Sequence, residues 1–118
     1  YVTVFKPHLK NENGEPWPSY RCIFPEPPPP GTVAPCSEIG VLGSVVGVIG
    51  TLQATEVLKE ILEIGETLAG RLLIYDALSA RFETVKVAWD PDNPLSGRNP
   101  TIRDLSIHAD APGAVCVA

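Results

Sequence analysis

Cys36 is the residue of this sequence best placed to act as a nucleophile. It stands in the segment APCSE, directly ahead of a long apolar stretch that predicts a helix. The unpaired amides at the amino terminus of a helix favour the thiolate form of a nearby cysteine. Glu38 acts in the opposite direction, because a neighbouring carboxylate disfavours the thiolate. From these residues alone a small buried hydrophobe is the more common role for such a cysteine, and both interpretations stay open.

The other two cysteines and the two histidines indicate no second reactive centre. Three cysteines are an odd number and stand far apart, so they do not form the framework of a secreted disulfide protein. This favours a reducing, cytoplasmic location. His8 and His108 have no partner at the spacing of metal ligands. Cys116 lies in a small-residue tail, where we expect a solvated thiol.

Composition excludes two broad classes of function. The net charge is −5 and the nine Lys and Arg residues are scattered, which argues against a nucleic-acid partner. The longest apolar stretch, 39–52, is shorter than the roughly 20 residues that cross a bilayer, so a buried helix is expected. The sequence contains no Met and does not begin with a basic segment and a hydrophobic run. We therefore expect a piece of a longer protein.

The first thirty residues predict strands separated by loops. Residues 1–5 (YVTVF) and 20–24 (YRCIF) are rich in β-branched and aromatic residues, which suit strands. Residues 7–18 are polar with Gly and Pro, which is typical of a surface loop. The run PEPPPPG at 25–31 predicts a stiff polyproline-type connector, because proline fixes φ and lacks an amide donor. A rigid spacer is the favoured role, with a ligand for an SH3-type domain as the alternative.

A long amphipathic helix is predicted between residues 40 and 64. Apolar residues recur there at spacings of three to five, and Gly65 is placed to end the helix. Four residues are expected to form the solvated face: Glu56, Lys59, Glu60 and Glu63. Its early turns contain Gly40, Gly43, Gly47 and Gly50, each of which costs about 1 kcal/mol relative to Ala. We expect another helix or backbone to approach that side closely.

Two strands, 71–78 and 82–89, predict a β-hairpin joined by residues 79–81. Val85, Val87 and Trp89 alternate onto one face of the second strand. Asp76 could orient a substrate, but capping of the turn is the favoured role. The remaining chain is a loop, a short apolar element and a tail. We expect one domain over residues 1–110 and a tail or linker over 111–118.

Four motifs in this order resemble the carboxy-terminal half of the MoeB, MoeZ and ThiF family of ubiquitin-activating-like enzymes. They are FPEPPPPG, the block CSEIGVLG that begins at Cys36, the helical GTLQATE and the strand end YDAL. The resemblance implies an α/β fold class, namely the carboxy-terminal part of a Rossmann-like ubiquitin-activating-type fold with one long helix and a mostly antiparallel set of strands. The segment GVLGSVVGVIG is not a phosphate loop, because its glycines lie inside a predicted apolar helix.

The resemblance implies an ATP-dependent adenylyltransferase and sulfurtransferase. In that family the terminal glycine of a ubiquitin-like sulfur-carrier protein is adenylated and then converted to a thiocarboxylate, for molybdopterin synthesis, thiamin synthesis or tRNA thiolation. ATP and Mg would be bound upstream, so this chain by itself is expected to bind neither and to be unable to adenylate. The implied partners are the carrier, a sulfur donor or rhodanese domain, and a second copy in a homodimer.

The resemblance also bears on the cysteines. In the family, the cysteine at the place of Cys36 lies on a loop that crosses the carrier's tail and is proposed to form a thioester or an acyl disulfide. Many relatives hold a structural zinc with two C-x-x-C pairs. Here Ser19, Asn93 and Ser96 replace three of those cysteines and Cys22 alone remains. We therefore expect no zinc, and two loops held by packing alone and more mobile.

Two other functions remain as alternatives at this point. The first is a non-catalytic carrier-binding or dimerisation module that has lost the thiol and zinc chemistry. The second is an adaptor that presents the proline-rich connector to an SH3 or WW domain. Reactivity of Cys36 separates the enzyme from the module, and binding of the isolated proline peptide identifies the adaptor.

Overall fold

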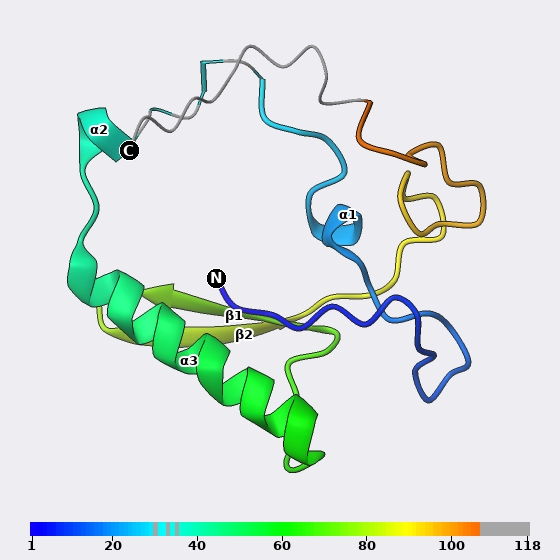
Figure 1. Ribbon diagram of the computed structural model, residues 1–118, viewed down its shortest axis with the longest axis horizontal. Helices are drawn as coiled ribbons and strands as arrows, with labels where there is room; N and C mark the ends of the chain where they lie inside the picture. The colour runs from blue at the N-terminus through cyan, green and yellow to red at the C-terminus, as the bar shows by residue number, and fades with distance from the viewer. Residues whose placement is uncertain (30, 33, 35, 107–118) are drawn as a thin grey trace.

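A computed structural model describes residues 1–29, 31–32, 34 and 36–106. The elements run in the order α1 (Tyr20–Ile23), α2 (Cys36–Ile39), α3 (Gly43–Leu62), β1 (Arg71–Asp76) and β2 (Arg81–Lys86). Helix α3 lies across the β1–β2 hairpin, and α1 lies beside the loops that follow β2 (Figure 1). The expected α/β class, with one long helix and antiparallel strands, is confirmed. The expected boundary at residue 110 falls outside the described residues.

The hairpin forms where the sequence predicts it, with shorter strands. β1 and β2 pair antiparallel from Arg71 opposite Lys86 to Asp76 opposite Arg81. The rings of Tyr75 and Phe82 stack across the pair with centroids 4.5 Å apart, an aromatic contact that helps to fix the register.

The amino-terminal segment, residues 1–5, lies along the edge of β1 that does not pair with β2. Val2 exchanges two backbone hydrogen bonds with Leu73, at 2.9 and 2.8 Å, and Val4 forms a bridge with Ala69. The predicted strand at 1–5 is therefore present only as two isolated bridges beside the hairpin. Val2, Leu68 and Ala69 are the buried apolar residues of the described chain, so the core lies between this segment and the chain that leads into β1.

The prediction of a strand at 20–24 is wrong, because these residues form the helical turn α1. Ser19 begins the turn, and its amide donates a hydrogen bond to the sulfur of Cys22 at 3.4 Å. This is the reciprocal half of a capping box, with a cysteine in the place of the usual Glu or Gln. Pro25 follows and cannot continue a helix. Local capping thus overrides the strand propensity of the side chains.

The predicted long helix is present as α3, and the single turn α2 precedes it. Gly40 adopts φ 70° and separates α2 from α3. At the other end α3 stops at Leu62, and Glu63 takes a left-handed conformation with φ 52°. Among the described residues, even this longest helix lacks the length of apolar sequence that a membrane crossing requires.

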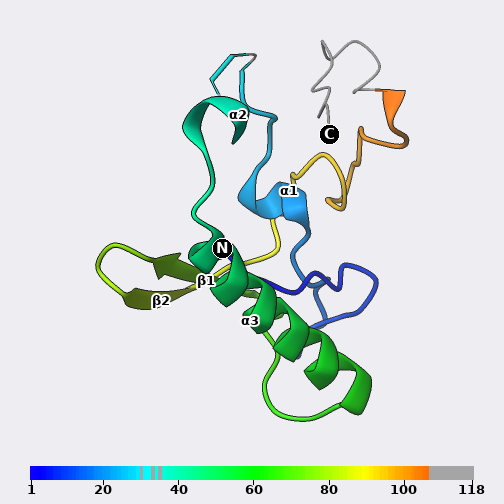
Figure 2. The same cartoon turned by 60° about the vertical axis from the view of Figure 1, so that its left-hand side comes forward.

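The predicted faces of α3 are reversed in its last turns, whereas Val45, Ile49 and Leu52 are half-buried as the pattern predicts. Glu56 is buried at 8% exposure, whereas Val57, Ile61 and Leu62 are more than half exposed. The amino-terminal segment packs against the side that contains Glu56 and Glu60, and Figure 2 shows α3 with open space on its other side. The expectation that the four charged residues form the solvated face is therefore wrong for Glu56. The hydrophobic pattern identified the helix correctly and the environment of its last turns incorrectly.

The glycines of α3 have no close neighbour within the described residues. A Cβ atom built at Gly43, Gly47 or Gly50 meets nothing within 4 Å outside the helix's own backbone. The expected close approach is thus not present in this chain. In the isolated chain we predict that Gly47→Ala stabilises α3 by about 1 kcal/mol, because alanine is the better helix former and finds free space. Amide hydrogen exchange along α3 measures this, with Gly50→Ala as a second site, and slower exchange is the expected result. Faster exchange would show that a neighbour packs against Gly47.

Candidate functional site

Four positions of this chain match the zinc-binding cysteines of relatives. Their side chains lie close together in the structure, and they are Ser19, Cys22, Asn93 and Ser96. The hydroxyl of Ser96 lies 2.8 Å from that of Ser19 and 3.3 Å from Oδ1 of Asn93. The sulfur of Cys22 lies 3.8 Å from the Ser19 hydroxyl and 3.4 Å from Nδ2 of Asn93. We call these four residues the polar cluster. It joins the α1 turn to the loop at 90–98.

Asn93 is the most connected member of the polar cluster. Its Oδ1 accepts hydrogen bonds from the amides of Leu95 at 3.1 Å and Ser96 at 2.7 Å. Its Nδ2 donates to the sulfur of Cys22 and to the carbonyl of Asp90, the latter at 2.6 Å. Asn93 is 1% exposed and Ser19 is 2% exposed. Hydrogen bonds made by buried groups hold the loop in place, because leaving such groups unpaired is costly.

The sulfur of Cys22 accepts from three N–H groups. The donors are the amide of Ser19 at 3.4 Å, the amide of Asp90 at 3.5 Å and the side-chain nitrogen of Asn93. Two of these donors come from the loop beyond β2, far along the sequence. The expectation that the two loops are held by packing alone is therefore wrong, because hydrogen bonds join them directly.

The donor set of the polar cluster does not fit zinc. Structural zinc sites use four cysteine or histidine ligands, whereas this cluster offers one thiol, two neutral hydroxyls and one amide. The amide oxygen is already occupied by the two backbone N–H groups. Within the part of the chain that the structure describes, no three His, Cys, Asp or Glu residues form a group suited to a metal ion.

The loop around the cluster is packed tightly against itself. Nε1 of Trp89 donates to the carbonyl of Ser96 at 3.0 Å, and the guanidinium of Arg98 lies 6.0 Å from the centre of the same ring. A Cβ atom on Gly97 would overlap the carbonyl oxygens of Asn93 and Pro91. Glycine is required there because backbone atoms cannot move aside cheaply.

Cys36 is the first residue of α2 and is separated from α3 by the bend at Gly40. The placement of the Cys36 side chain lies outside what the structure describes. A helix of one turn has a much smaller dipole than a long one, so the argument that a helix terminus activates this thiol loses most of its force. Cys116 and His108 also fall outside the described residues.

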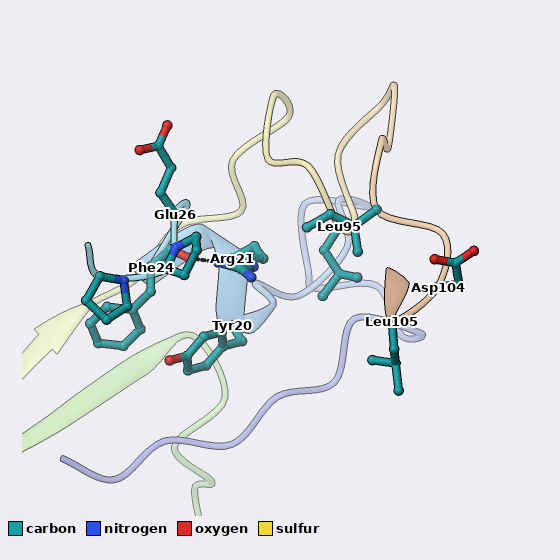
Figure 3. Close-up of a pocket in the computed structure, with 10 residues that line it drawn as sticks. Tyr20, Arg21, Phe24, Glu26, Leu95, Asp104 and Leu105 are labelled. Carbon is teal, nitrogen blue, oxygen red and sulfur yellow. Dashed lines mark hydrogen bonds between the residues drawn. The ribbon is translucent and has the colours of Figure 1, made fainter. Parts of the chain in front are cut away.

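A pocket of about 380 Å³ opens between α1, the proline-rich connector and the chain after β2. Figure 3 shows Tyr20 and Phe24 on one side of it, with Leu95 and Leu105 on the other. Arg21 contributes little free charge there, because its guanidinium donates to the carbonyls of Phe24 and Pro25 at 3.2 and 3.3 Å. The walls are mostly apolar, so the pocket suits a chain segment rather than a phosphate.

Glu56 has a structural role that its position on the helix does not reveal. One carboxylate oxygen accepts from the buried amide of Leu68 at 2.8 Å, and the other pairs with Lys59. Lys6 forms a second ion pair with Glu60. These contacts attach α3 to the amino-terminal segment and to the start of the hairpin. The spacing of Glu56 and Lys59 signalled the local pair only, because the contact with Leu68 depends on tertiary structure.

Asp76 caps the hairpin turn, as the favoured interpretation of the sequence has it. One of its oxygens accepts from the amides of Leu78 and Ser79, at 3.0 and 3.4 Å, and the other accepts from the Ser79 hydroxyl at 2.7 Å. These bonds, the Ser79 hydroxyl foremost, hold the pKa of Asp76 below its ordinary value of 3.8.

This arrangement gives a testable pH dependence. A lowered pKa in the folded state means that the ionised carboxylate contributes stability above the pKa of the unfolded chain, near 3.8, and loses it as the pH falls through the lower folded value. We expect an NMR titration of the Asp76 carboxyl to show a midpoint below 3.8. In Ser79→Ala the midpoint should move up, because the largest cause is removed. A midpoint of Asp76 that Ser79→Ala leaves unchanged would contradict this assignment.

Comparison with known proteins indicates the same family as the four sequence motifs do. The model of the ThiF family matches residues 1–95. The chain belongs to the ThiF family. The sulfur carrier protein adenylyltransferase of Thermus thermophilus is 50% identical over 104 residues, which are 88% of this chain and 38% of that protein. The SAMP-activating enzyme E1 of Haloferax volcanii is 54% identical over 80 residues, 68% of this chain and 30% of that protein.

A third relative extends the comparison to animals. The adenylyltransferase and sulfurtransferase MOCS3 of Bos taurus is 48% identical over 89 residues, which are 75% of this ThiF-family chain and 20% of that protein. The chain thus spans well under half the length of each of these relatives. The family assignment confirms the resemblance drawn from the four motifs. The activity of the whole protein is a separate question.

Proposed function

We propose that this ThiF-family chain is the carboxy-terminal part of an ATP-dependent adenylyltransferase. Its substrate is the terminal glycine carboxylate of a ubiquitin-like sulfur-carrier protein, which is activated for thiocarboxylate formation. The observation that carries the proposal is the 50% identity, over 88% of this chain, with a protein named sulfur carrier protein adenylyltransferase. Names of two further relatives describe activation of SAMP and adenylyltransfer with sulfurtransfer.

ATP and Mg are assigned to residues upstream of this chain. Gly43, Gly47 and Gly50 of the apolar block lie within α3. Gly40 lies in the bend after α2, so it follows a helix and not the strand that leads into a glycine-rich phosphate loop. A phosphate loop needs free amides ahead of a helix. The adenylation chemistry of the parent therefore requires sequence that these 118 residues do not contain.

Within this chain, Cys36 is the proposed nucleophile toward the activated carrier. A thiolate that attacks the acyl-adenylate forms a thioester and releases AMP, so one difficult displacement becomes two easier steps. Support comes from the position of Cys36 five residues after the proline-rich connector and from its place in the family's motif. The apolar pocket beside that connector offers a surface for an extended carrier tail.

The remaining assignments follow from the same proposal. The parent acts in the cytoplasm with a sulfur donor or rhodanese domain and pairs as a homodimer. The exposed apolar and glycine-containing sides of α3 favour burial against further protein, either upstream sequence or a second copy. The proposal assigns no zinc to the polar cluster, since the cluster lacks the ligands.

Carrier-dependent exchange of pyrophosphate into ATP tests the proposal. The full-length protein is mixed with a ubiquitin-like carrier that ends in Gly-Gly, and with the same carrier lacking its last glycine as the matched control. We expect exchange with the intact carrier alone, because only its carboxylate can reach the α-phosphate. Exchange that is independent of the carrier, or absent with every carrier tested, would contradict the proposed substrate class.

A further inference from the structure

We propose that the polar cluster of Ser19, Cys22, Asn93 and Ser96 serves as a metal-free cross-link between the α1 turn and the loop at 90–98. It would do by hydrogen bonding what a bound metal ion does in relatives with four cysteines. The inference concerns the stability of the chain and does not depend on the proposed enzymatic activity.

Geometry is the first support. The cluster is closed by four contacts, which run from 2.8 Å between the two serine hydroxyls to 3.8 Å between Ser19 and Cys22. Sulfur atoms bound to one tetrahedral zinc at about 2.3 Å lie about 3.8 Å from one another. None of the four contacts is longer than that distance, so the ring that they form has about the dimensions of a metal site. Shorter contacts are expected where oxygen and nitrogen replace sulfur, because these atoms are smaller and hydrogen-bond to each other.

Charge is the second support. Four thiolates repel one another and need a divalent cation to hold them together. Here the two hydroxyls and the amide are neutral, and their donors and acceptors satisfy each other with only 1% exposure at Asn93 and 2% at Ser19. A buried polar network whose members are paired can hold a structure together without an ion.

The three N–H groups that point at the sulfur of Cys22 are the third support. Two are backbone amides, from Ser19 and Asp90, and their positions are set by the turns on either side. Asn93 provides the third donor and at the same time accepts from Ser96. One residue therefore connects the sulfur of α1 to the backbone of the opposite loop, as the metal would.

The first arm of the test measures metal content and chelator sensitivity in the full-length protein. Protein produced in zinc-supplemented medium is analysed for zinc, and its Tm is recorded with and without a strong zinc chelator. We expect far less than one zinc per chain and the same Tm in both conditions. One zinc per chain, or a Tm that the chelator lowers by several degrees, would overturn the proposal.

The second arm restores the metal site. The triple substitution Ser19→Cys, Asn93→Cys and Ser96→Cys should give a protein that binds one zinc per chain and whose Tm falls when the chelator is added. The matched control adds Cys22→Ser to the same three changes, which leaves three thiols and should sharply reduce retention of zinc. Cobalt(II) in place of zinc reports four-thiolate coordination by its visible absorption. A triple variant that binds no metal, folded or not, would show that the four positions do not share a metal-sized site.

Discussion

Replacing Cys36 with alanine in the full-length protein should reduce thiocarboxylate formation on the carrier by on the order of 100-fold or more. The reason is that the proposed thioester cannot form without the thiol. Adenylation precedes that step and uses residues upstream, so carrier-dependent pyrophosphate exchange should continue at the wild-type rate. Mass spectrometry of the carrier gives the first quantity, and a radiolabel assay gives the second.

The matched control for this variant is Cys116→Ala, which removes a thiol with no assigned role. It should leave both rates unchanged. If Cys36→Ala forms thiocarboxylate as fast as the unmodified protein, Cys36 is not the nucleophile and the sulfur donor attacks the adenylate directly. The outcome decides whether the chemistry of sulfur transfer extends into this chain at all, since the alternative is a non-catalytic carrier-binding or dimerisation module.

Asn93→Ala should lower the local stability of the 90–98 loop by about 3 kcal/mol, because several buried groups lose their partners at once. The amides of Leu95 and Ser96 lose their acceptor, and the sulfur of Cys22 loses a donor. Native-state amide exchange at Leu95 and Ser96 measures the change, with faster exchange expected in the variant.

Asn11→Ala is the control for that prediction. Asn11 makes the same kind of turn, with its Oδ1 accepting from the amides of Asn13 and Glu15 at 2.9 and 3.0 Å, but in an exposed loop. Water replaces these bonds, so a cost of about 1 kcal/mol or less is expected. Equal effects of the two substitutions would mean that the polar cluster adds nothing beyond an ordinary turn.

Periodicity and turn chemistry located the main elements from the sequence. The apolar spacing after Gly40 identified α3, and β-branched residues on either side of a short turn identified the hairpin. Asp76 was assigned to its turn for a local reason that the structure bears out. These features depend on residues that are neighbours in the chain, which is why pattern alone reveals them.

Features that depend on tertiary contacts could not be predicted in the same way. Strand propensity at 20–24 gave no sign that Cys22 would accept from Ser19 and turn the segment into α1. The charge pattern of α3 did not reveal that Glu56 accepts from Leu68. Replacement of three cysteines suggested that a metal was gone, but not that the replacements hydrogen-bond to one another. Except for the local contact between Ser19 and Cys22, each contact joins segments whose approach is set by the fold.

The most direct test of the central claim is mass spectrometry of a ubiquitin-like carrier after incubation with the full-length protein, ATP, Mg and a sulfur donor. The account predicts that the carrier gains the mass of one sulfur in exchange for one oxygen, and only when ATP is present. A carrier that keeps its free carboxylate under these conditions, while the protein is folded and binds ATP, would contradict the assignment of this chain to a sulfur-carrier adenylyltransferase.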